Sequence, residues 1–185
     1  MKKLMLATLL SAAVASPVWA ADYRIDDQGA HASINFKVKH LGYSWLTGRF
    51  NTFSGNFSYD PANVEASVIS VDIDTNSIDS NHAKRDKHLR SADFLEVDKY
   101  PDAKFVSTKV EVTGEDEMTV YGDFTLRGVT KNIAIDASKV GEGKDPWGGY
   151  RAGFEGVAEI DMADYGFATD FGTVMLELHV EGIRI

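Results

Sequence analysis

The side chains best suited to chemistry gather in one short segment. His82, Asp86, His88 and Ser91 all fall within the run 81–91. Histidine and aspartate can hold a divalent metal or transfer protons, and serine with histidine and aspartate can form a hydrolase triad. If the segment is helical, His82 and Asp86 share one face because they are four residues apart, whereas His88 lies on another face.

Positive charge in the same turns weakens these interpretations. Lys84, Arg85, Lys87 and Arg90 lie among the candidates, and their charge opposes the binding of a metal cation. Neighbours on one short helix also lack the mutual geometry of a triad, and the sequence contains no G-x-S-x-G turn. Ser91 is interpreted as a helix cap. We therefore expect no catalytic residue, no metal, no cofactor and no enzymatic activity.

A second candidate metal site is equally weak. The run from Asp72 to Ser77 is similar to the start of a calcium-binding loop. Ser77, however, stands where such a loop needs glycine, and Ala83 stands where it needs glutamate. We interpret the run as the solvent-exposed edge of a strand.

Composition restricts the class of protein. The chain has 185 residues, 44% of them hydrophobic, with no cysteine and a formal charge of −9. These values indicate one globular domain. The lack of cysteine excludes disulfides and thiol nucleophiles. The negative charge disfavours nucleic acids and anionic membrane surfaces as partners.

Residues 1–20 have the features of a secretory signal peptide. Two lysines form a basic start, the apolar stretch that follows is too short to span a bilayer, and Val18 and Ala20 provide small residues at a cleavage site. We expect cleavage after Ala20 and export to a bacterial periplasm. Residues 21–185 would then form the single folded domain.

Apolar and polar residues alternate along most of residues 21–185, which predicts β-strands. The alternating sets are Ile34, Phe36 and Val38; Phe53, Phe57 and Tyr59; Ile69, Val71 and Ile73; Val106, Val110 and Val112; Val120, Phe124 and Leu126; Ile133 and Ile135; and Val174, Leu176, Leu178 and Val180. With the stretch 154–160 they give about eight strands, enough for an antiparallel sheet to close into a barrel. Phe50 is out of phase with Phe53, which predicts a bulge near Asn51.

One segment breaks the strand pattern. Residues 81–90 are rich in helix formers and lack β-branched side chains, and residues 79–81 offer three candidate caps. We predict one short helix between a strand ending near Thr75 and a strand starting near Lys104. A helix has no place in a sheet ladder, so we expect it at a rim of the barrel.

The same segment has the composition of a lid. Its Leu89, Phe94 and Leu95 can cover the barrel interior. Its Arg85, Lys87 and Arg90 would then face water or the head group of a lipid.

Four blocks of sequence carry a family resemblance. They are HLGYSWL at 40–46, NHAKRDKHLRSADFL at 81–95, GDFTLRGVTK at 122–131, and DPWGG at 145–149 followed by RAGFE at 151–155. Together they resemble the YceI-like family of bacterial periplasmic proteins. The resemblance implies an all-β fold, an extended eight-stranded antiparallel lipocalin-like barrel with the short helical insert at its rim. It also implies that the interior holds a polyisoprenoid or another long-chain lipid, without indicating which one.

The inward face of such a barrel is rich in rings and poor in charge. We assign ligand binding to Phe36, Trp45, Phe57, Phe94, Phe105, Phe124, Leu126, Phe154 and Leu178, with Trp45 near a mouth. Burial of a lipid chain there would stabilise the complex by roughly 0.8 kcal/mol per methylene. Periodicity alone leaves open whether these side chains line a cavity or form a solid core.

These observations predict a periplasmic binding protein that holds a long-chain amphiphile for transport, storage or sequestration. Two alternatives stay open: an enzyme that acts on a lipid through His82, Asp86 or His88, and a stress-related barrel without a ligand. The expected partners are the polyisoprenoid or similar lipid and a membrane cytochrome or quinone-linked protein that supplies it. No nucleic acid partner is expected, and the sequence leaves the oligomeric state undetermined.

Overall fold

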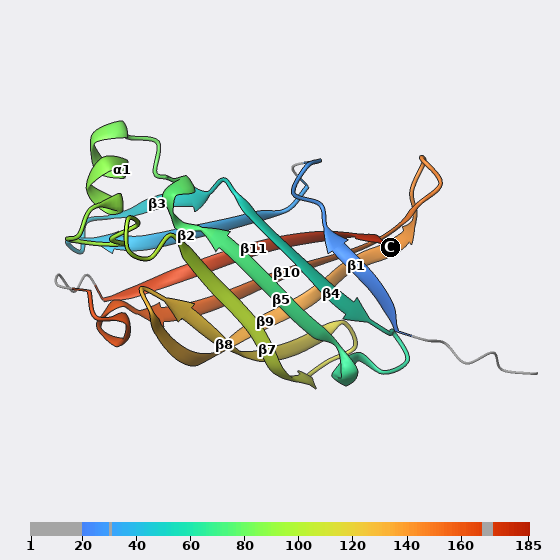
Figure 1. Cartoon of the computed structure of the whole chain (residues 1–185). Helices are drawn as coiled ribbons and strands as arrows, with labels where there is room; N and C mark the ends of the chain where they lie inside the picture. Colours follow the sequence, from blue (N-terminus) through green and yellow to red (C-terminus); the bar gives the residue numbers. More distant parts are fainter. Residues whose placement is uncertain (1–19, 30, 168–171) are drawn as a thin grey trace, which may run out of the picture.

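The computed structural model describes residues 20–29, 31–167 and 172–185, so all but the last residue of the predicted signal peptide lies outside the described residues. Within the described part, eleven strands form one sheet and one α-helix lies outside it (Figure 1). The strands are β1 (Ala21–Ile25), β2 (Ser33–His40), β3 (Ser44–Phe50), β4 (Phe53–Tyr59), β5 (Val68–Asp74), β6 (Ile78–Asp79), β7 (Asp102–Val112), β8 (Glu117–Leu126), β9 (Val129–Lys144), β10 (Tyr150–Asp161) and β11 (Thr173–Arg184), and the helix is α1 (Ala83–Arg90). No helix in the described ranges has the length and hydrophobicity needed to cross a bilayer.

The sheet closes on itself through β1, a strand of five residues. β1 pairs antiparallel with β4 on one side and with β11 on the other, which closes an eight-stranded antiparallel barrel. The predicted fold class is therefore confirmed. Eleven strands form eight staves of the barrel, because three staves each consist of two strands placed end to end. These three pairs are β1 with β2, which both bond to β11, β4 with β3, and β5 with β6.

The predicted irregularity near Asn51 is a strand break and not a bulge. β3 ends at Phe50 and β4 begins at Phe53. In the gap, the N–H of Asn51 donates to the Ser77 carbonyl at 3.2 Å, and the N–H of Thr52 donates to Ser77 Oγ at 3.0 Å. The break lets Phe50 and Phe53 both reach the barrel interior although they are an odd number of positions, three, apart in the chain.

A true bulge occurs in β7 instead. Its pairing with β8 shifts between Ser107 and Lys109, so Phe105 and Val110 both face inward. The expectation that Val106 shares the face of Val110 was wrong, because Val106 is 37% exposed.

Helix α1 lies at one end of the barrel, as expected for an insert at the rim (Figure 1). Its first residue is Ala83 and its cap is His82, whose Nδ1 accepts a hydrogen bond from the N–H of Arg85 at 3.2 Å. The cap predicted among residues 79–81 is therefore wrong. Asp79 belongs to β6, which pairs with β3 and leads the chain into the helix.

Several glycines make room for aromatic rings from nearby strands of the sheet. The pairs are Gly48 with Phe36, Gly122 with Phe105 and Gly182 with Phe57. A Cβ added to Gly122 would lie 2.3 Å from Cζ of Phe105 and 2.7 Å from the carbonyl oxygen of Val106. Each ring thus packs directly on glycine backbone, and a larger side chain would have to displace it.

Replacement of Gly122 by Ala should therefore destabilise the barrel. We expect the free energy of unfolding, measured by urea denaturation, to fall by roughly 1–3 kcal/mol because Phe105 must leave its position. Gly141→Ala is the matched control, since nothing lies within 4 Å of a Cβ added there. The control should unfold at an unchanged or slightly higher urea concentration. Equal losses in the two variants would contradict the packing argument.

Candidate functional site

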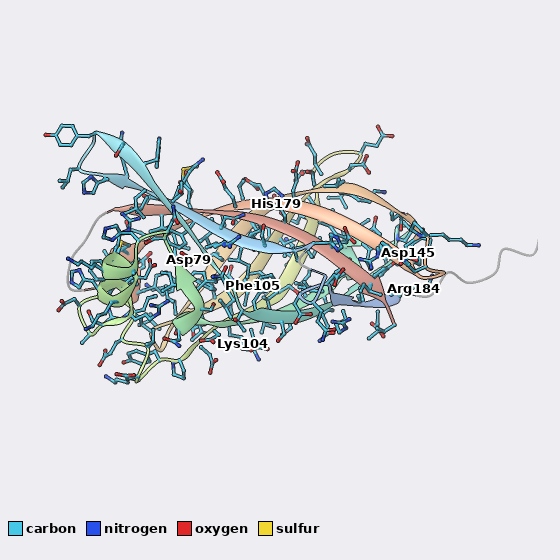
Figure 2. The ribbon with its side chains drawn as sticks, turned by 90° about the horizontal axis from the view of Figure 1, so that it is seen from above. Asp79, Lys104, Phe105, Asp145, His179 and Arg184 are labelled. Carbon is cyan, nitrogen blue, oxygen red and sulfur yellow. The ribbon has the colours of Figure 1, made fainter. Side chains whose placement is uncertain are left out.

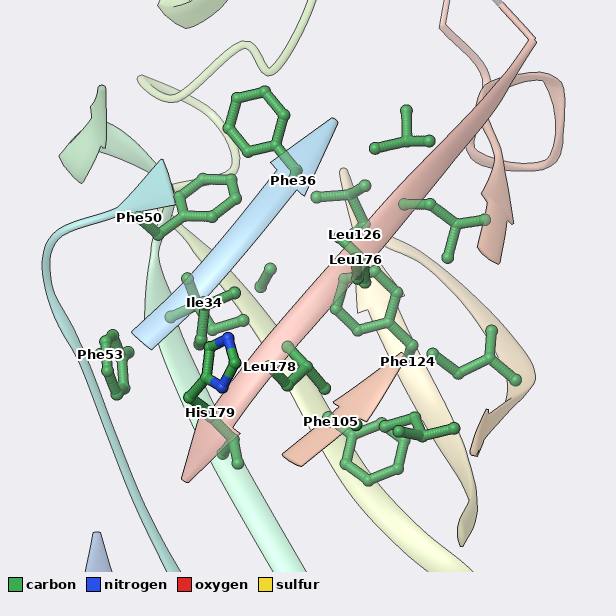
Figure 3. Close-up of a pocket in the computed structure, with 18 of the residues that line it drawn as sticks. Ile34, Phe36, Phe50, Phe53, Phe105, Phe124, Leu126, Leu176, Leu178 and His179 are labelled. Carbon is green, nitrogen blue, oxygen red and sulfur yellow. The ribbon is translucent and has the colours of Figure 1, made fainter. Parts of the chain in front are cut away.

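The barrel encloses a cavity of about 860 Å³. This volume falls within the range of about 300–1,000 Å³ that is usual for small-molecule sites. Strands from around the barrel contribute its mainly apolar lining, and Figure 3 shows Phe36, Phe50, Phe105 and Phe124 around the same space. The question that periodicity left open is answered by this volume: the interior is hollow.

All nine residues assigned to ligand binding from the sequence line this cavity. They are Phe36, Trp45, Phe57, Phe94, Phe105, Phe124, Leu126, Phe154 and Leu178. Their contact with a ligand stays a prediction. Sequence reasoning did not assign Phe50 and Phe53, which also line the cavity, and the break of phase between them was the signal that could have found them.

Packed aromatic rings shut the end of the barrel away from α1. The rings of Tyr23 and Phe57 are stacked with centroids 4.9 Å apart. The ring of Phe154 contacts those of Phe57 and Tyr59 edge-on, at 5.6 and 5.1 Å. Tyr23 and Tyr59 are 2% and 4% exposed, so solvent does not reach the cavity through this end.

The opposite end, beside α1, is open and polar. The exposed residues that line the cavity there are Lys39, His40, Ser44, Trp45, Thr47, Asn81, His82 and His88. Two other exposed lining residues, Glu155 and His179, border the cavity from the wall formed by β10 and β11. A ligand therefore finds its main entrance between the β2–β3 hairpin and α1, where Trp45 lies as predicted.

Asp86 anchors α1 and is buried. Its Oδ1 accepts hydrogen bonds from the Ser80 N–H at 2.8 Å and from the Ser80 hydroxyl. Burial raises the pKa of Asp86, but the hydrogen bonds from Ser80, a backbone hydrogen bond at His82 and the charge of Arg90 together hold that pKa below its ordinary value. Arg85 completes the cluster, with Nε donating to Ser80 Oγ at 2.7 Å and Nη2 to the Ser80 carbonyl at 2.6 Å.

Arg90 holds the other end of the helix in the same way. Its Nε donates to the Asn76 carbonyl at 2.7 Å and its Nη2 to the Ile78 carbonyl at 2.6 Å. Arg85 and Arg90 thus both donate to the backbone that precedes α1. For Arg90 the expectation that it faces water or a head group is corrected, whereas Arg85 also lines the cavity and its contact with a head group stays a prediction. Lys87 is exposed, as expected.

The candidate proton-transfer and metal residues on α1 do not converge. His82 caps the helix, Asp86 faces Ser80, and His88 Nε2 lies 2.9 Å from Asp93 Oδ2. Ser91 Oγ donates to the backbone carbonyl of His88 at 2.7 Å, so it is not placed for attack by a triad.

The run similar to a calcium loop is also engaged elsewhere. Asp72 forms an ion pair with Lys104 at 3.2 Å, and Asp74 Oδ1 accepts the N–H of Asn76 at 2.9 Å.

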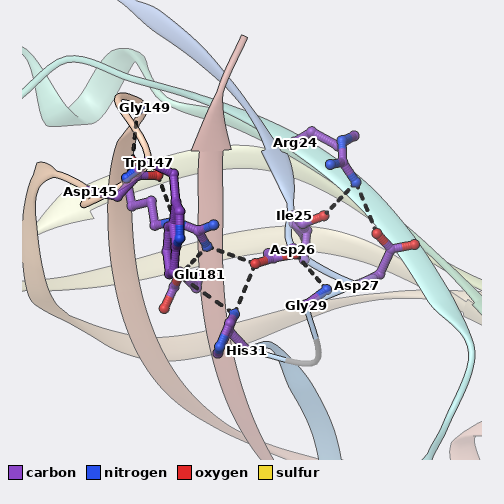
Figure 4. A network of polar contacts seen from close by, with 11 residues as sticks. Arg24, Ile25, Asp26, Asp27, Gly29, His31, Asp145, Trp147, Gly149 and Glu181 are labelled. Carbon is purple, nitrogen blue, oxygen red and sulfur yellow. Dashed lines mark hydrogen bonds and ion pairs between the residues drawn. The ribbon is translucent and has the colours of Figure 1, made fainter.

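One polar cluster escaped sequence reasoning because its members are far apart in the chain. Asp26, His31 and Glu181 bring ligand-type atoms within 4.8 Å of one another. The guanidinium of Arg151 already occupies this cluster, with Nη1 2.7 Å from Asp26 Oδ2 and also bonded to Glu181 (Figure 4). Nε of Arg151 lies 3.1 Å from Asp145 Oδ2. A metal ion would compete with this resident cation, so we interpret the cluster as structural.

The three structures tied together by Arg151 are the β1–β2 loop, the β9–β10 hairpin and β11. A hydrogen bond with His31 and one from Arg151 hold the pKa of Asp26 well below its usual range. Because the folded-state pKa is depressed, this carboxylate stabilises the fold above its ordinary pKa of 3.8, and the contribution is lost as the pH falls below that value.

Replacement of Asp26 by Asn should reveal this linkage. We expect the free energy of unfolding at pH 7 to fall by roughly 1.5–3 kcal/mol, because two charge-assisted hydrogen bonds weaken. The loss of stability between pH 5 and pH 3, measured by urea denaturation, should be smaller than in the wild type. Asp27→Asn changes the next, exposed carboxylate and should preserve the acid sensitivity. If the free energy of unfolding fell equally with pH in the wild type and in Asp26→Asn, Asp26 would not be the source of the acid sensitivity.

A closed antiparallel barrel with an apolar cavity, one shut end and one polar mouth defines a binding-type β-barrel protein. Residues 23–182 match the YceI-like domain, and the chain belongs to the YceI-like family. It is 56% identical to a UPF0312 protein of Shewanella sp. (strain ANA-3) and 54% identical to a UPF0312 protein of Vibrio cholerae, in each case over the full length of both chains.

Solved structures share the fold. The Campylobacter jejuni YCEI protein is 31% identical with a TM-score of 0.72, covering 80% of this chain and 90% of its own. Burkholderia cenocepacia BcnA is 20% identical with a TM-score of 0.76, over 85% of this chain and 98% of its own. A polyisoprenoid binding domain from Saccharophagus degradans is 16% identical with a TM-score of 0.63, over 90% of this chain and 100% of its own.

Proposed function

We propose that this protein holds a long-chain amphiphile, a polyisoprenoid or similar lipid, inside the barrel and transports, stores or sequesters it in the periplasm. The observation that carries the proposal is the apolar cavity of about 860 Å³, shut at one end and open beside α1. Membership of the YceI-like family supports a lipid ligand, and the similarly folded Saccharophagus degradans domain is described as polyisoprenoid-binding.

The distribution of polarity along the cavity sets the direction in which a lipid lies. Phe105, Phe124 and Leu178 surround the deep part, where each buried methylene contributes roughly 0.8 kcal/mol. The mouth carries the exposed His82, whose Nδ1 accepts the N–H of Arg85, so its Nε2–H is left to donate a hydrogen bond to a head group. The tail therefore enters first and the head group stays beside α1.

Binding without catalysis is the function that the site supports best. The three residues on which the enzymatic alternative depends each have a separate structural partner, and a solid core, on which the ligand-free alternative depends, is replaced by a cavity. The proposal includes cleavage of the signal peptide and a membrane cytochrome or quinone-linked partner as the source of the lipid, both of which stay predictions from the sequence.

Native mass spectrometry of gently purified protein tests the proposal directly. We expect the mass of the chain plus one long-chain lipid, and extraction should return that lipid chemically unaltered. A spectrum of unliganded chain alone, before and after incubation with polyprenyl lipids, would support the ligand-free alternative. Turnover of a lipid that is lost on changing His82, Asp86 or His88 would support the enzyme.

Phe124→Asp should abolish lipid retention. An unpaired carboxylate in the apolar cavity costs several kcal/mol, so we expect the lipid mass to disappear from the native spectrum and the melting temperature to fall. Thr125→Asp is the matched control, because it adds the same charge one residue along β8, opposite Lys104 on β7. Full lipid occupancy in Phe124→Asp would show that this part of the interior is not the binding site.

The placement of α1 gives a further test of release. Leu89, Phe94 and Leu95 all line the cavity at its mouth, so Phe94→Ala should speed lipid release by several-fold while the barrel stays folded. Amides of residues 81–95 should exchange hydrogen faster in lipid-free protein than in the complex. Trp147→Ala, at the far end of the barrel, is the control and should release lipid at the wild-type rate. Identical exchange of residues 81–95 with and without lipid would exclude a lid.

A further inference from the structure

We propose that the tip of the β2–β3 hairpin, residues 40–45, docks the protein on the surface of an anionic lipid bilayer. The tip carries three large exposed side chains: Leu41 is 66% exposed, Tyr43 is 88% exposed and Trp45 is 53% exposed. Tyrosine and tryptophan with an aliphatic neighbour are the side chains that favour the interface between lipid and water, because each joins an apolar body to a polar group.

The backbone conformation of the tip indicates that Leu41 is present for function and not for the stability of the turn. The N–H of Tyr43 donates to the His40 carbonyl at 2.9 Å, which closes a turn whose central residues, Leu41 and Gly42, have φ of 50° and 81°. A turn of this kind favours Asn followed by Gly, and a leucine with positive φ is strained. The chain thus places an exposed apolar side chain where a polar residue would give a more stable turn.

Charge around the tip is complementary to an anionic surface. Although the chain has a net charge of −9, residues 28–59 contain no Asp or Glu. Of their basic side chains, Lys37 is paired with Glu177 at 2.5 Å, whereas Lys39 and Arg49 are exposed. Helix α1 lies at the same end of the barrel as the β2–β3 hairpin (Figure 2). Its Lys84 and Lys87 are exposed. The acidic side chains thus lie outside the hairpin, and the exposed charges that the hairpin itself presents are positive.

The tip is continuous with the entrance of the cavity. Lys39, His40, Ser44 and Trp45 line the cavity, whereas Leu41 and Tyr43 extend beyond it. Docking through the tip would bring the mouth against the bilayer, where a lipid could pass between the two without crossing open water. This last consequence rests on the proposed function, but the docking itself does not.

Sedimentation with lipid vesicles tests the docking. Wild-type protein should sediment with vesicles of mixed phosphatidylcholine and phosphatidylglycerol, and less with vesicles of phosphatidylcholine alone or in added salt. The double variant Leu41→Asn with Tyr43→Ser should partition about tenfold more weakly, because two apolar side chains no longer leave water. Leu41→Asn also relieves strain in the turn, so the variant should fold at least as stably as the wild type.

Trp147→Ser is the matched control, since Trp147 is 77% exposed on the β9–β10 hairpin at the opposite end. All variants share one N-terminus, so any retained leader would add the same vesicle binding to each. Unchanged binding of the double variant, an equal loss in Trp147→Ser, or no binding of the wild type would each overturn the proposal. Native mass spectrometry separates this result from the proposed function, because the double variant should still retain lipid.

Discussion

Closure of the sheet is the constraint on which the rest of the molecule depends. An open sheet of this size would leave long strand edges unpaired, and the five residues of β1 remove them by joining β4 to β11. The inward side chains of the same strand, Tyr23 and Ile25, belong to the cluster that shuts one end of the cavity. The chain leaves β1 at Asp26, which Arg151 ties to distant strands. The barrel wall, its closed end and the polar cluster around Arg151 are therefore all connected through β1 and the residue that follows it.

The sequence was sufficient to predict the barrel and many of its inward-facing side chains, because the same alternation of apolar and polar residues determines both the strands and the face on which each side chain lies. Phe36, Phe124 and Leu178 could be placed inside from their phase alone, and all lie there. The pattern failed where pairing with a neighbour changes the phase, as in the β7 bulge next to Phe105. It also gave no sign of the contact between Arg151 and Asp26, which are 125 residues apart, since only the closed barrel brings them together.

Basic residues near the mouth divide into two groups that composition alone does not separate. Arg85 and Arg90 donate to backbone carbonyls of the segment around β6, a strand of only two residues that can satisfy few of its own polar groups. These arginines hold α1 on the rim, and their rigid planar groups suit that task. The lysines of α1 remain at the surface, so their positive charge comes from side chains that the fold does not need.

The aromatic rings that shut one end of the barrel have a consequence for how a ligand enters and leaves the cavity. Under the proposed function, a lipid that enters tail first through the mouth beside α1 withdraws head first along the same path. The protein then imposes no direction on the movement of its cargo. Net flow between two membranes would follow the difference in lipid chemical potential between them, and the same molecule would load or unload according to which surface it meets.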